Sequence, residues 1–494
     1  MRYGSALAVL CLTACSSAGV GDHCADRSDC GGSLQCVADV CVPGCQRAPD
    51  CGDGYACEPD GTCREATGQL GDTCTSEVEC APGLSCSFDP MALTSLDASC
   101  VAESAGRAPG ETCAADSDCR NGTCAIGRCV DLCDDTRDCV EGTACTLIPR
   151  VEAGGRTFSA CLAAFGTIAW NIPIPGPSSQ ILLPIPSSAT SVAVTFEVED
   201  PLQLVGATSV IAPDGVHHLV TLSDDSSTWP NFSDPVRHEP AAGQSVLAMP
   251  SSPATPLVAG AYSMIVKSLH RDGSPGSATP TATAVIKVDA AVLLDLHFYF
   301  LDFTDHPCTT AFTSTMTAAT AQTASFFQND YLGALRSVFA DGGVSIGGIT
   351  YEDITDHPEL DSPEATTAAS LLALGAFPTG VNIFFVRTLS PIGLQAFGPN
   401  PGPAGLANTP QSGVIVSLDT LCYQNWAEVA RLTAHEVAKY MGLYENVDLN
   451  NNNDPIGDDV DSTPSDNLMF NSELGGTTLS PGQRAILSRS VVLQ

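Results

Sequence analysis

The cysteines of this chain are crowded into its N-terminal part. Twenty of the 24 cysteines fall within the 138 residues from Cys24 to Cys161, in a chain of 494 residues. Few large apolar side chains separate them, so this part cannot bury much of a core. Such a density is typical of exported domains that are held together by disulfides. The feature therefore predicts a disulfide-rich region at residues 24–161 that forms in an oxidising compartment.

The cysteine-rich region repeats itself. The stretches GDHCADRSDC, GDTCTSEVEC and GETCAADSDC open three predicted modules, at residues 24–63, 74–100 and 113–161, with eight, four and eight cysteines. The even counts predict pairing within each module, although connectivity cannot be read from sequence. Zinc binding is the alternative, and export and the absence of CxxC pairs argue against it. The repeats resemble the disulfide modules of extracellular stalks, which implies a spacer or, less favoured, a partner-binding surface.

The chain begins with an export signal. In MRYGSALAVLCLTAC, Arg2 precedes an apolar run at residues 6–12 that is too short to span a bilayer. The letters LTAC resemble the bacterial lipoprotein box, which implies that Cys15 is lipidated and becomes the first mature residue. We expect a signal peptide at 1–14 and a lipid-anchored tether at 15–23, which attaches the chain to the membrane through acyl chains. An ordinary signal peptide that is cleaved nearby is the alternative.

The charge of the chain restricts its partners. The formal net charge is −36, from 20 basic and 56 acidic residues. So acidic a surface repels the phosphates of nucleic acids and anionic lipid headgroups. We therefore expect no nucleic acid partner, whereas binding of divalent cations is compatible with the composition.

Strand patterns follow the cysteine-rich region. SVAVTFEVED alternates apolar residues from Val192 to Val198, which predicts a half-buried strand. Several more strand-length runs follow, separated by turn signals such as APDG and without a helical pattern between them. We therefore expect an all-β sandwich at residues 162–288.

The last part of the chain mixes strands and helices, which predicts an α+β domain at residues 289–494. Residues 316–340 predict one long helix, and NWAEVARLTAHEVAKYMG predicts another, capped by Asn425 and ended by Gly442 in a left-handed conformation. Ser480 and Gln483 form a capping box for a last helix. The inward stripe of the second helix is expected to consist of Trp426, Ala430, Thr433, Val437 and Met441.

The stretch HEVAKYMGLYE, at residues 435–445, indicates what chemistry this domain could have. With the order strand, long helix, strands and His-Glu helix, and with Met469 in the later stretch DNLMF, the domain resembles the metzincin metallopeptidases, in particular pappalysin-like exported bacterial peptidases. Their zinc signature is H-E-x-x-H-x-x-G-x-x-H. The resemblance implies zinc-ligand positions at His435 and Glu445, with Glu436 as the general base. It also implies a Met-turn at Met469.

Lys439 departs from this signature at the second zinc-ligand position. Lysine must lose a proton before it can bind a metal, and this costs about 4–5 kcal/mol at pH 7. While protonated, it places a positive charge where the ion should lie. Glu436 is three residues away on the helix, within reach of an ion pair. We therefore expect a pseudo-peptidase with no bound cofactor, in which the ammonium group fills the vestigial metal site.

The expected protein is a lipoprotein at the bacterial outer membrane or cell surface whose peptidase-like domain binds an extracellular protein or peptide. One alternative is an active zinc metalloendopeptidase that uses His435, Glu445 and a third group. His306 or His357, from two TDHP stretches, are candidates for that group. Another alternative is an adhesive or structural surface protein whose cysteine modules bind the partner. The simplest alternative is that residues 435–445 are only the end of an amphipathic helix.

Two further features remain in the last domain. The even count of cysteines suggests a disulfide between Cys308 and Cys422. The stretch DLNNNNDPIGDDVD places oxygen donors at alternate positions, which suits calcium, although a solvated acidic loop is the alternative. The candidate calcium ligands are Asp448, Asn450, Asn452, Asp454 and Asp459.

Overall fold

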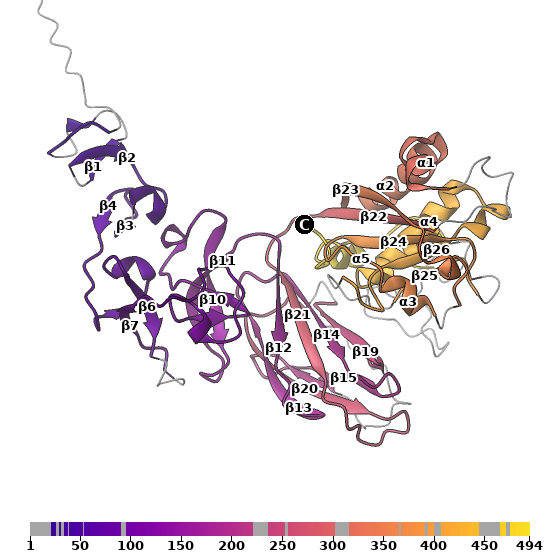
Figure 1. The fold of residues 1–494 in the computed structure, drawn as a ribbon, viewed down its shortest axis with the longest axis horizontal. Helices are drawn as coiled ribbons and strands as arrows, with labels where there is room; N and C mark the ends of the chain where they lie inside the picture. Colours follow the sequence, from indigo (N-terminus) through magenta and orange to yellow (C-terminus); the bar gives the residue numbers. More distant parts are fainter. Residues whose placement is uncertain are drawn as a thin grey trace, which may run out of the picture.

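The chain folds into three successive parts in a computed structural model (Figure 1). They are the disulfide region (residues 24–161), the two-sheet region, from β12 (Thr167–Ile172) to β21 (Thr281–Lys287), and the C-terminal region, from β22 (Leu293–Leu301) to α5 (Pro481–Leu487). This confirms a multidomain chain with a disulfide-rich beginning, a strand-rich middle and helices near the end. The structure describes residues 21–25, 29–30, 34–37, 39–52, 54–89, 95–220, 236–251, 255–301, 316–364, 367–390, 394–399, 407–443, 465–470 and 475–494.

The disulfide region is built from short hairpins. Each 3-10 helix that the structure describes in it starts a few residues after one cysteine and ends at, or directly before, the next cysteine. The 3-10 helices are η2 (Ala48–Cys51), η3 (Glu77–Glu79), η4 (Asp116–Asp118) and η5 (Thr136–Asp138). The strands are β1 (Leu34–Val37), β2 (Val40–Pro43), β3 (Tyr55–Cys57), β4 (Cys63–Glu65), β5 (Thr73–Cys74), β6 (Leu84–Phe88), β7 (Ala98–Ala102), β8 (Cys124–Ala125), β9 (Arg128–Cys129), β10 (Thr143–Arg150) and β11 (Arg156–Ala163).

All twenty cysteines of this region form disulfides, and each bond lies within one predicted module. They make five four-cysteine units in which the first cysteine pairs with the third and the second with the fourth. Because every one of these sulfur atoms is bonded to another, the zinc alternative for the cysteine clusters is wrong. The pairs are Cys24–Cys36, Cys30–Cys41, Cys45–Cys57, Cys51–Cys63, Cys74–Cys86, Cys80–Cys100, Cys113–Cys124, Cys119–Cys129, Cys133–Cys145 and Cys139–Cys161.

The disulfide units pack on one another and on the next region. Arg47 of the second unit donates to the carbonyl oxygens of Val140 and Thr143 at 2.7 and 2.9 Å. Phe88 and Phe158 lie in one apolar cluster with the core of the two-sheet region. The first unit has a separate small cluster around Cys24. Most of the disulfide region therefore shares its core with the strands that follow it.

Removing the Cys139–Cys161 disulfide is expected to lower the free energy of unfolding. The bond spans 22 residues and ties β11 to the end of η5, just before β10. Its loss raises the conformational entropy of the unfolded chain, which lowers the free energy of unfolding by about 3 kcal/mol. Denaturant unfolding of a Cys139→Ser/Cys161→Ser variant measures this. A Cys24→Ser/Cys36→Ser variant is the control, and it should leave the unfolding of the two-sheet region unchanged. Equal losses in both variants would contradict the shared core.

Two antiparallel sheets form the strand-rich region. Their orders are β12-β21-β14-β19-β17 and β13-β20-β15-β16, with β18 beside β15. Both sheets contribute to one apolar cluster that contains Phe196 and Tyr262. The strands are β12 (Thr167–Ile172), β13 (Ser178–Ile185), β14 (Ser191–Glu197), β15 (Leu204–Ile211), β16 (His217–Val220), β17 (Arg237–Glu239), β18 (Ala241–Ala242), β19 (Gln244–Met249), β20 (Gly260–Leu269) and β21 (Thr281–Lys287).

The alternating stretch that predicted a half-buried strand forms β14, which is buried on both faces. Val194 and Phe196 face the core between the sheets. Ala193, on the opposite face, belongs to the apolar cluster of the C-terminal region. The prediction of one solvent-facing side was therefore wrong, because the next region covers that side with its own core.

The two-sheet region is expected to lose stability in acid through His238. Its ring is buried, with Nε2 accepting from the Ala207 N–H at 2.9 Å and Nδ1 donating to the Val246 carbonyl at 2.8 Å. Burial lowers the pKa of His238 to about 4, so the unfolded chain binds this proton more readily than the folded one. Stability is therefore full above pH 6.5 and falls by about 3 kcal/mol as pH drops towards 4. Denaturant unfolding at both pH values checks this, and a His238→Gln variant should show a weaker pH dependence.

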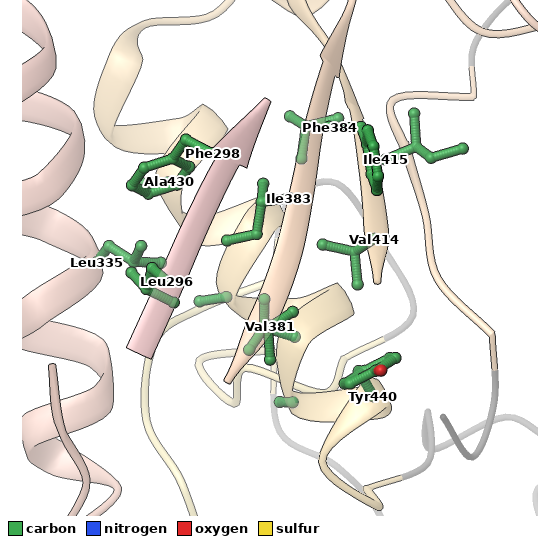
Figure 2. Close-up of a cluster of buried hydrophobic side chains, with 14 of the residues drawn as sticks. Leu296, Phe298, Leu335, Val381, Ile383, Phe384, Val414, Ile415, Ala430 and Tyr440 are labelled. Carbon is green, nitrogen blue, oxygen red and sulfur yellow. The ribbon is translucent and has the colours of Figure 1, made fainter. Parts of the chain in front are cut away.

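The C-terminal region has one five-stranded sheet of order β23-β22-β24-β26-β25. Its pairs are parallel except at the edge, where β25 runs antiparallel to β26. The helices α2 (Leu332–Asp341) and α4 (Trp426–Tyr440) cover one face, and Figure 2 shows apolar side chains from β22, β24 and β26 gathered near them. The strands are β22 (Leu293–Leu301), β23 (Ser345–Ile354), β24 (Val381–Val386), β25 (Ala396–Phe397) and β26 (Val414–Ser417).

The predicted long helix at residues 316–340 is broken. Ala324 has an extended backbone with ψ of 132° after α1, and the six residues from Phe326 to Tyr331 form the π-helix η7. The Gln328 side chain donates to the carbonyl of Ala321 at 2.6 Å, and η7 buries Phe327 and Tyr331 in the core. The helices are α1 (Ala318–Thr323), η7 (Phe326–Tyr331), α2 (Leu332–Asp341), η8 (Pro358–Leu360), α3 (Ala368–Leu372), η9 (Leu418–Cys422), α4 (Trp426–Tyr440) and α5 (Pro481–Leu487).

Among the described residues, no helix combines the length and the apolar character that crossing a membrane requires.

Candidate functional site

The helix α4 carries the residues of the metallopeptidase-like motif. The Asn425 side chain caps it by accepting from the N–H groups of Ala427 and Glu428, as predicted. Gly442 follows its end with a φ of 114°, which also confirms the prediction. The predicted stripe faces the core, since its members are all buried. These are Trp426, Ala430, Thr433, Val437 and Met441.

His435 lies in the second half of α4 and is only 8% exposed. Its Nδ1 is 2.7 Å from the carbonyl oxygen of Leu468, in the segment that contains Met469. Because a carbonyl oxygen only accepts, Nδ1 carries a hydrogen there, and the lone pair of the neutral ring is on Nε2. Met469 is fully buried beside this contact in the chain. The structure thus brings together the two features, His435 and the Met469 segment, that sequence separates by 33 residues.

The Met469 segment is held by a buried amide pair. Asn467 accepts from the N–H of Met469 at 2.8 Å and donates through Nδ2 to Gln483 Oε1 at 2.9 Å. Gln483 is the far end of the capping box with Ser480 that starts α5, and this box was predicted. The capping box thereby fixes the backbone that presents the Leu468 carbonyl to His435.

Substituting Asn467 by alanine is expected to destabilise this arrangement. Asn467 is 4% exposed, so its loss removes the acceptor of the Met469 N–H and one of the hydrogen-bond partners of Gln483, at a cost of about 2–3 kcal/mol. Thermal unfolding of the Asn467→Ala variant measures the loss. An Asn467→Asp variant keeps the acceptor for Met469 and should lose less, and equal losses would show that the acceptor plays no part.

Glu436 and Lys439 form a buried ion pair on the same helix. Lys439 Nζ lies 3.2 Å from Glu436 Oε2, and the two side chains are 13% and 9% exposed. The carboxylate oxygen accepts no aligned hydrogen bond from the described residues, so the attraction is electrostatic. Gly398, directly after edge strand β25, packs on this carboxylate, and a Cβ at Gly398 would lie 3.0 Å from Glu436 Oε2. The edge of the sheet thus closes over the ion pair.

A zinc ion does not fit the residues that the structure describes here. His435 has the orientation that a zinc ligand needs, since its Nδ1 is fixed by a backbone carbonyl. Lys439 occupies the position one helical turn later, and its ammonium group contacts the carboxylate that would have to activate water. A cation beside this ammonium would be repelled, and the helix offers His435 alone as a neutral ligand in its last two turns. The sequence motif identified Lys439 as a residue of this site, whereas no feature of the motif indicated that Gly398 or the Leu468 carbonyl lies there.

Several predicted site residues lie outside the described residues. These include Glu445, Cys15 and His306, so the third ligand position and the lipid anchor stay predictions. Cys422 is disulfide-bonded, and its partner is not among the described residues, so the predicted pair with Cys308 also stays a prediction. The other candidate for a third ligand, His357, starts η8 at the surface, where Nδ1 is 3.0 Å from Glu359. The predicted calcium ligands Asp448, Asn450, Asn452, Asp454 and Asp459 are also outside the described residues.

Comparisons with known proteins do not assign a family. No protein-family model matches the chain, and a search of curated proteins finds no match. Solved structures that match include one titled "Structure of the Clostridium Perfringens CspB protease", with 14% sequence identity and a TM-score of 0.17. The match covers 26% of this chain and 26% of that chain. A likeness of this size carries no argument about activity.

Proposed function

We propose that this chain is an exported lipoprotein whose C-terminal region is a non-catalytic, metallopeptidase-like domain that binds an extracellular protein or peptide. The density of disulfides supports export. The order of strands and helices, with His435 on α4 against the Met469 segment, supports the resemblance to metzincins. The lipid on Cys15 and the position at the outer membrane or cell surface belong to this proposal through the LTAC sequence.

The observation that carries the loss of catalysis is the ion pair between Lys439 and Glu436. A general base must take a proton from a water molecule that a metal or another group activates. Here the base is already paired with a fixed positive charge, and that charge occupies the second ligand position. The alternative of an active metalloendopeptidase would need the pair to separate and a replacement ligand to arrive.

The test uses the full chain, fluorescein-labelled casein as an unfolded-protein probe, and added zinc. We expect fluorescence anisotropy to rise saturably with chain concentration, while no labelled fragments are released. A Glu436→Gln variant is the control, and its rate of fragment release should equal that of the unchanged chain. Zinc-dependent release that Glu436→Gln abolishes would refute the loss of catalysis, and the absence of saturable binding would refute the binding role.

The alternative in which the cysteine modules bind the partner must be tested with a deletion smaller than the whole disulfide region. Deleting residues 24–161 would remove Phe88 and Phe158 from the core shared with the two-sheet region. Deleting residues 24–41 removes only the unit with its own small cluster. If casein binding survives this smaller deletion and disappears when the C-terminal region is disrupted, the modules are not the binding surface.

A further inference from the structure

A large cleft lies between the disulfide region and the two-sheet region. Its volume is about 1320 Å³, and its walls come from the hairpins β8–β9 and β10–β11 on one side and from β12 and β13 on the other. Small-molecule sites usually enclose roughly 300–1,000 Å³. The size of this cleft therefore suits a segment of polypeptide better than a metabolite.

The strand β12 presents an open edge to this cleft. It is the first strand of its sheet, and among the described residues it pairs with β21 alone. The Val288 N–H donates to the Gly166 carbonyl at 3.1 Å, so Gly166 and Val288 are a hydrogen-bonded pair. Such pairs alternate along an antiparallel ladder. Ala169 and Asn171 therefore direct their backbone N–H and C=O groups away from β21, and both residues line the cleft.

This edge lacks the features that usually keep other chains away. The residues of β12 read TIAWNI, with no charge and no proline, and the described residues donate no backbone hydrogen bond to its outer side. The opposite edge of the same sheet, β17, contains Arg237 and Glu239. The neighbouring edge of the other sheet, β13, contains Pro184. Charges and prolines commonly protect edge strands from pairing with other chains. Of these three edge strands, β12 is the one that has neither.

The charged side chains in the lining of the cleft are Arg128, Arg150, Glu152 and Glu197. Arg128, in β9, is half-buried in the wall and donates to the carbonyl of its neighbour Gly127 at 3.1 Å. Within the described parts of the chain, no carboxylate forms an ion pair with it. The other arginine of the wall, Arg150, differs, since it pairs with Asp116 at 3.0 Å. In a chain of net charge −36, an arginine without an acidic partner favours a carboxylate from outside.

We propose that this cleft binds an extended polypeptide segment of another protein, which adds a strand to the outer edge of β12 and places a carboxylate near Arg128. Strand addition satisfies the backbone groups of Ala169 and Asn171, and every second side chain of the segment then enters the cleft. The half-buried Trp170, with Pro173 and Pro175 just after β12, supplies an apolar wall, so apolar residues at alternate positions fit best. This site is separate from α4 and does not depend on the role proposed for the C-terminal region.

The test measures binding of labelled peptides to the full chain by fluorescence anisotropy. The probes are linear, C-terminally amidated peptides of alternating valine and serine that end in either aspartate or lysine. We expect the aspartate peptide to bind saturably and more tightly than the lysine peptide. Asn171→Pro removes one outward N–H and should raise the Kd about tenfold, whereas Asn171→Ala keeps that N–H and should change the Kd by less than about twofold.

Two further readouts keep the proposal testable if Asn171→Pro disturbs the fold. Arg128→Glu should abolish the preference for the aspartate peptide, while Arg64→Ala, which removes an exposed arginine outside the cleft, should not. Bound peptide should also slow hydrogen exchange at the amides of Ala169 and Asn171. The proposal is wrong if neither peptide binds saturably, or if binding leaves these amides unprotected and is unchanged by Arg128→Glu.

Discussion

Replacing Lys439 with histidine is expected to give a chain that binds one zinc ion. Histidine at this position lies four residues after His435 on the same face of α4, which is the spacing that lets two imidazoles reach one ion. The carbonyl of Leu468 already holds His435 Nδ1 at 2.7 Å, so its Nε2 carries the lone pair for the metal. The substitution also removes the ammonium group from Glu436.

The expected gain in zinc affinity is about a thousandfold or more, since deprotonating lysine alone costs about 4–5 kcal/mol. Calorimetric titration of the Lys439→His variant with zinc measures it. Lys439→Ala is the matched control, because it removes the charge without adding a ligand. Its zinc affinity should fall between that of the unchanged chain and that of Lys439→His. If Lys439→His binds zinc no better than the unchanged chain, the rest of the vestigial site has also been lost.

Replacing Lys287 with methionine is expected to destabilise the junction of the two-sheet and C-terminal regions. Lys287 is fully buried, and its Nζ donates to Asp289 Oδ1 at 2.7 Å and to the Leu493 carbonyl at 3.0 Å. Methionine fills the same space but removes the ammonium donor from both acceptors, so that Asp289 keeps only its backbone N–H donors. Breaking such a buried pair typically costs about 3–5 kcal/mol.

The pH dependence of unfolding provides a second test of this junction. Burial raises the pKa of Asp289, but hydrogen bonds from Lys287, Gly166 and Ala291 outweigh it and hold this pKa below its usual range. The stability from Asp289 is therefore present above the ordinary aspartate pKa and is lost as pH falls through the depressed one. The deficit of Lys287→Met should thus be largest near neutrality and smaller in strong acid. Denaturant unfolding measures it, with the half-buried Lys267→Met as the control, and a deficit independent of pH would contradict this account.

Local signals in the sequence predicted local structure well. Asn425, Gly442 and the Ser480–Gln483 box act within one helical turn, and each adopts the expected conformation. The pairing of cysteines within modules also followed from their even counts. The division of each large module into interleaved four-cysteine units did not, since several connectivities satisfy the same counts.

Features that depend on distant parts of the chain were missed. The alternation in β14 predicted one exposed face, but Ala193 packs against a region that begins a hundred residues later. The break at Ala324 follows no helix-breaking residue and is stabilised by tertiary burial of η7. The contact between His435 and the Leu468 carbonyl depends on backbone orientation, which the identities of the residues do not specify. The candidate site was therefore predictable in its residues but not in its hydrogen bonds.

The measurement that tests the central claim most directly is the zinc content of the unchanged full chain, purified in the presence of zinc and analysed by elemental mass spectrometry. The ion pair between Lys439 and Glu436 predicts a zinc content indistinguishable from that of a Lys439→Arg variant, which keeps the positive charge. One tightly bound zinc per chain, lost on His435→Ala substitution, would contradict the claim that the lysine has replaced the metal.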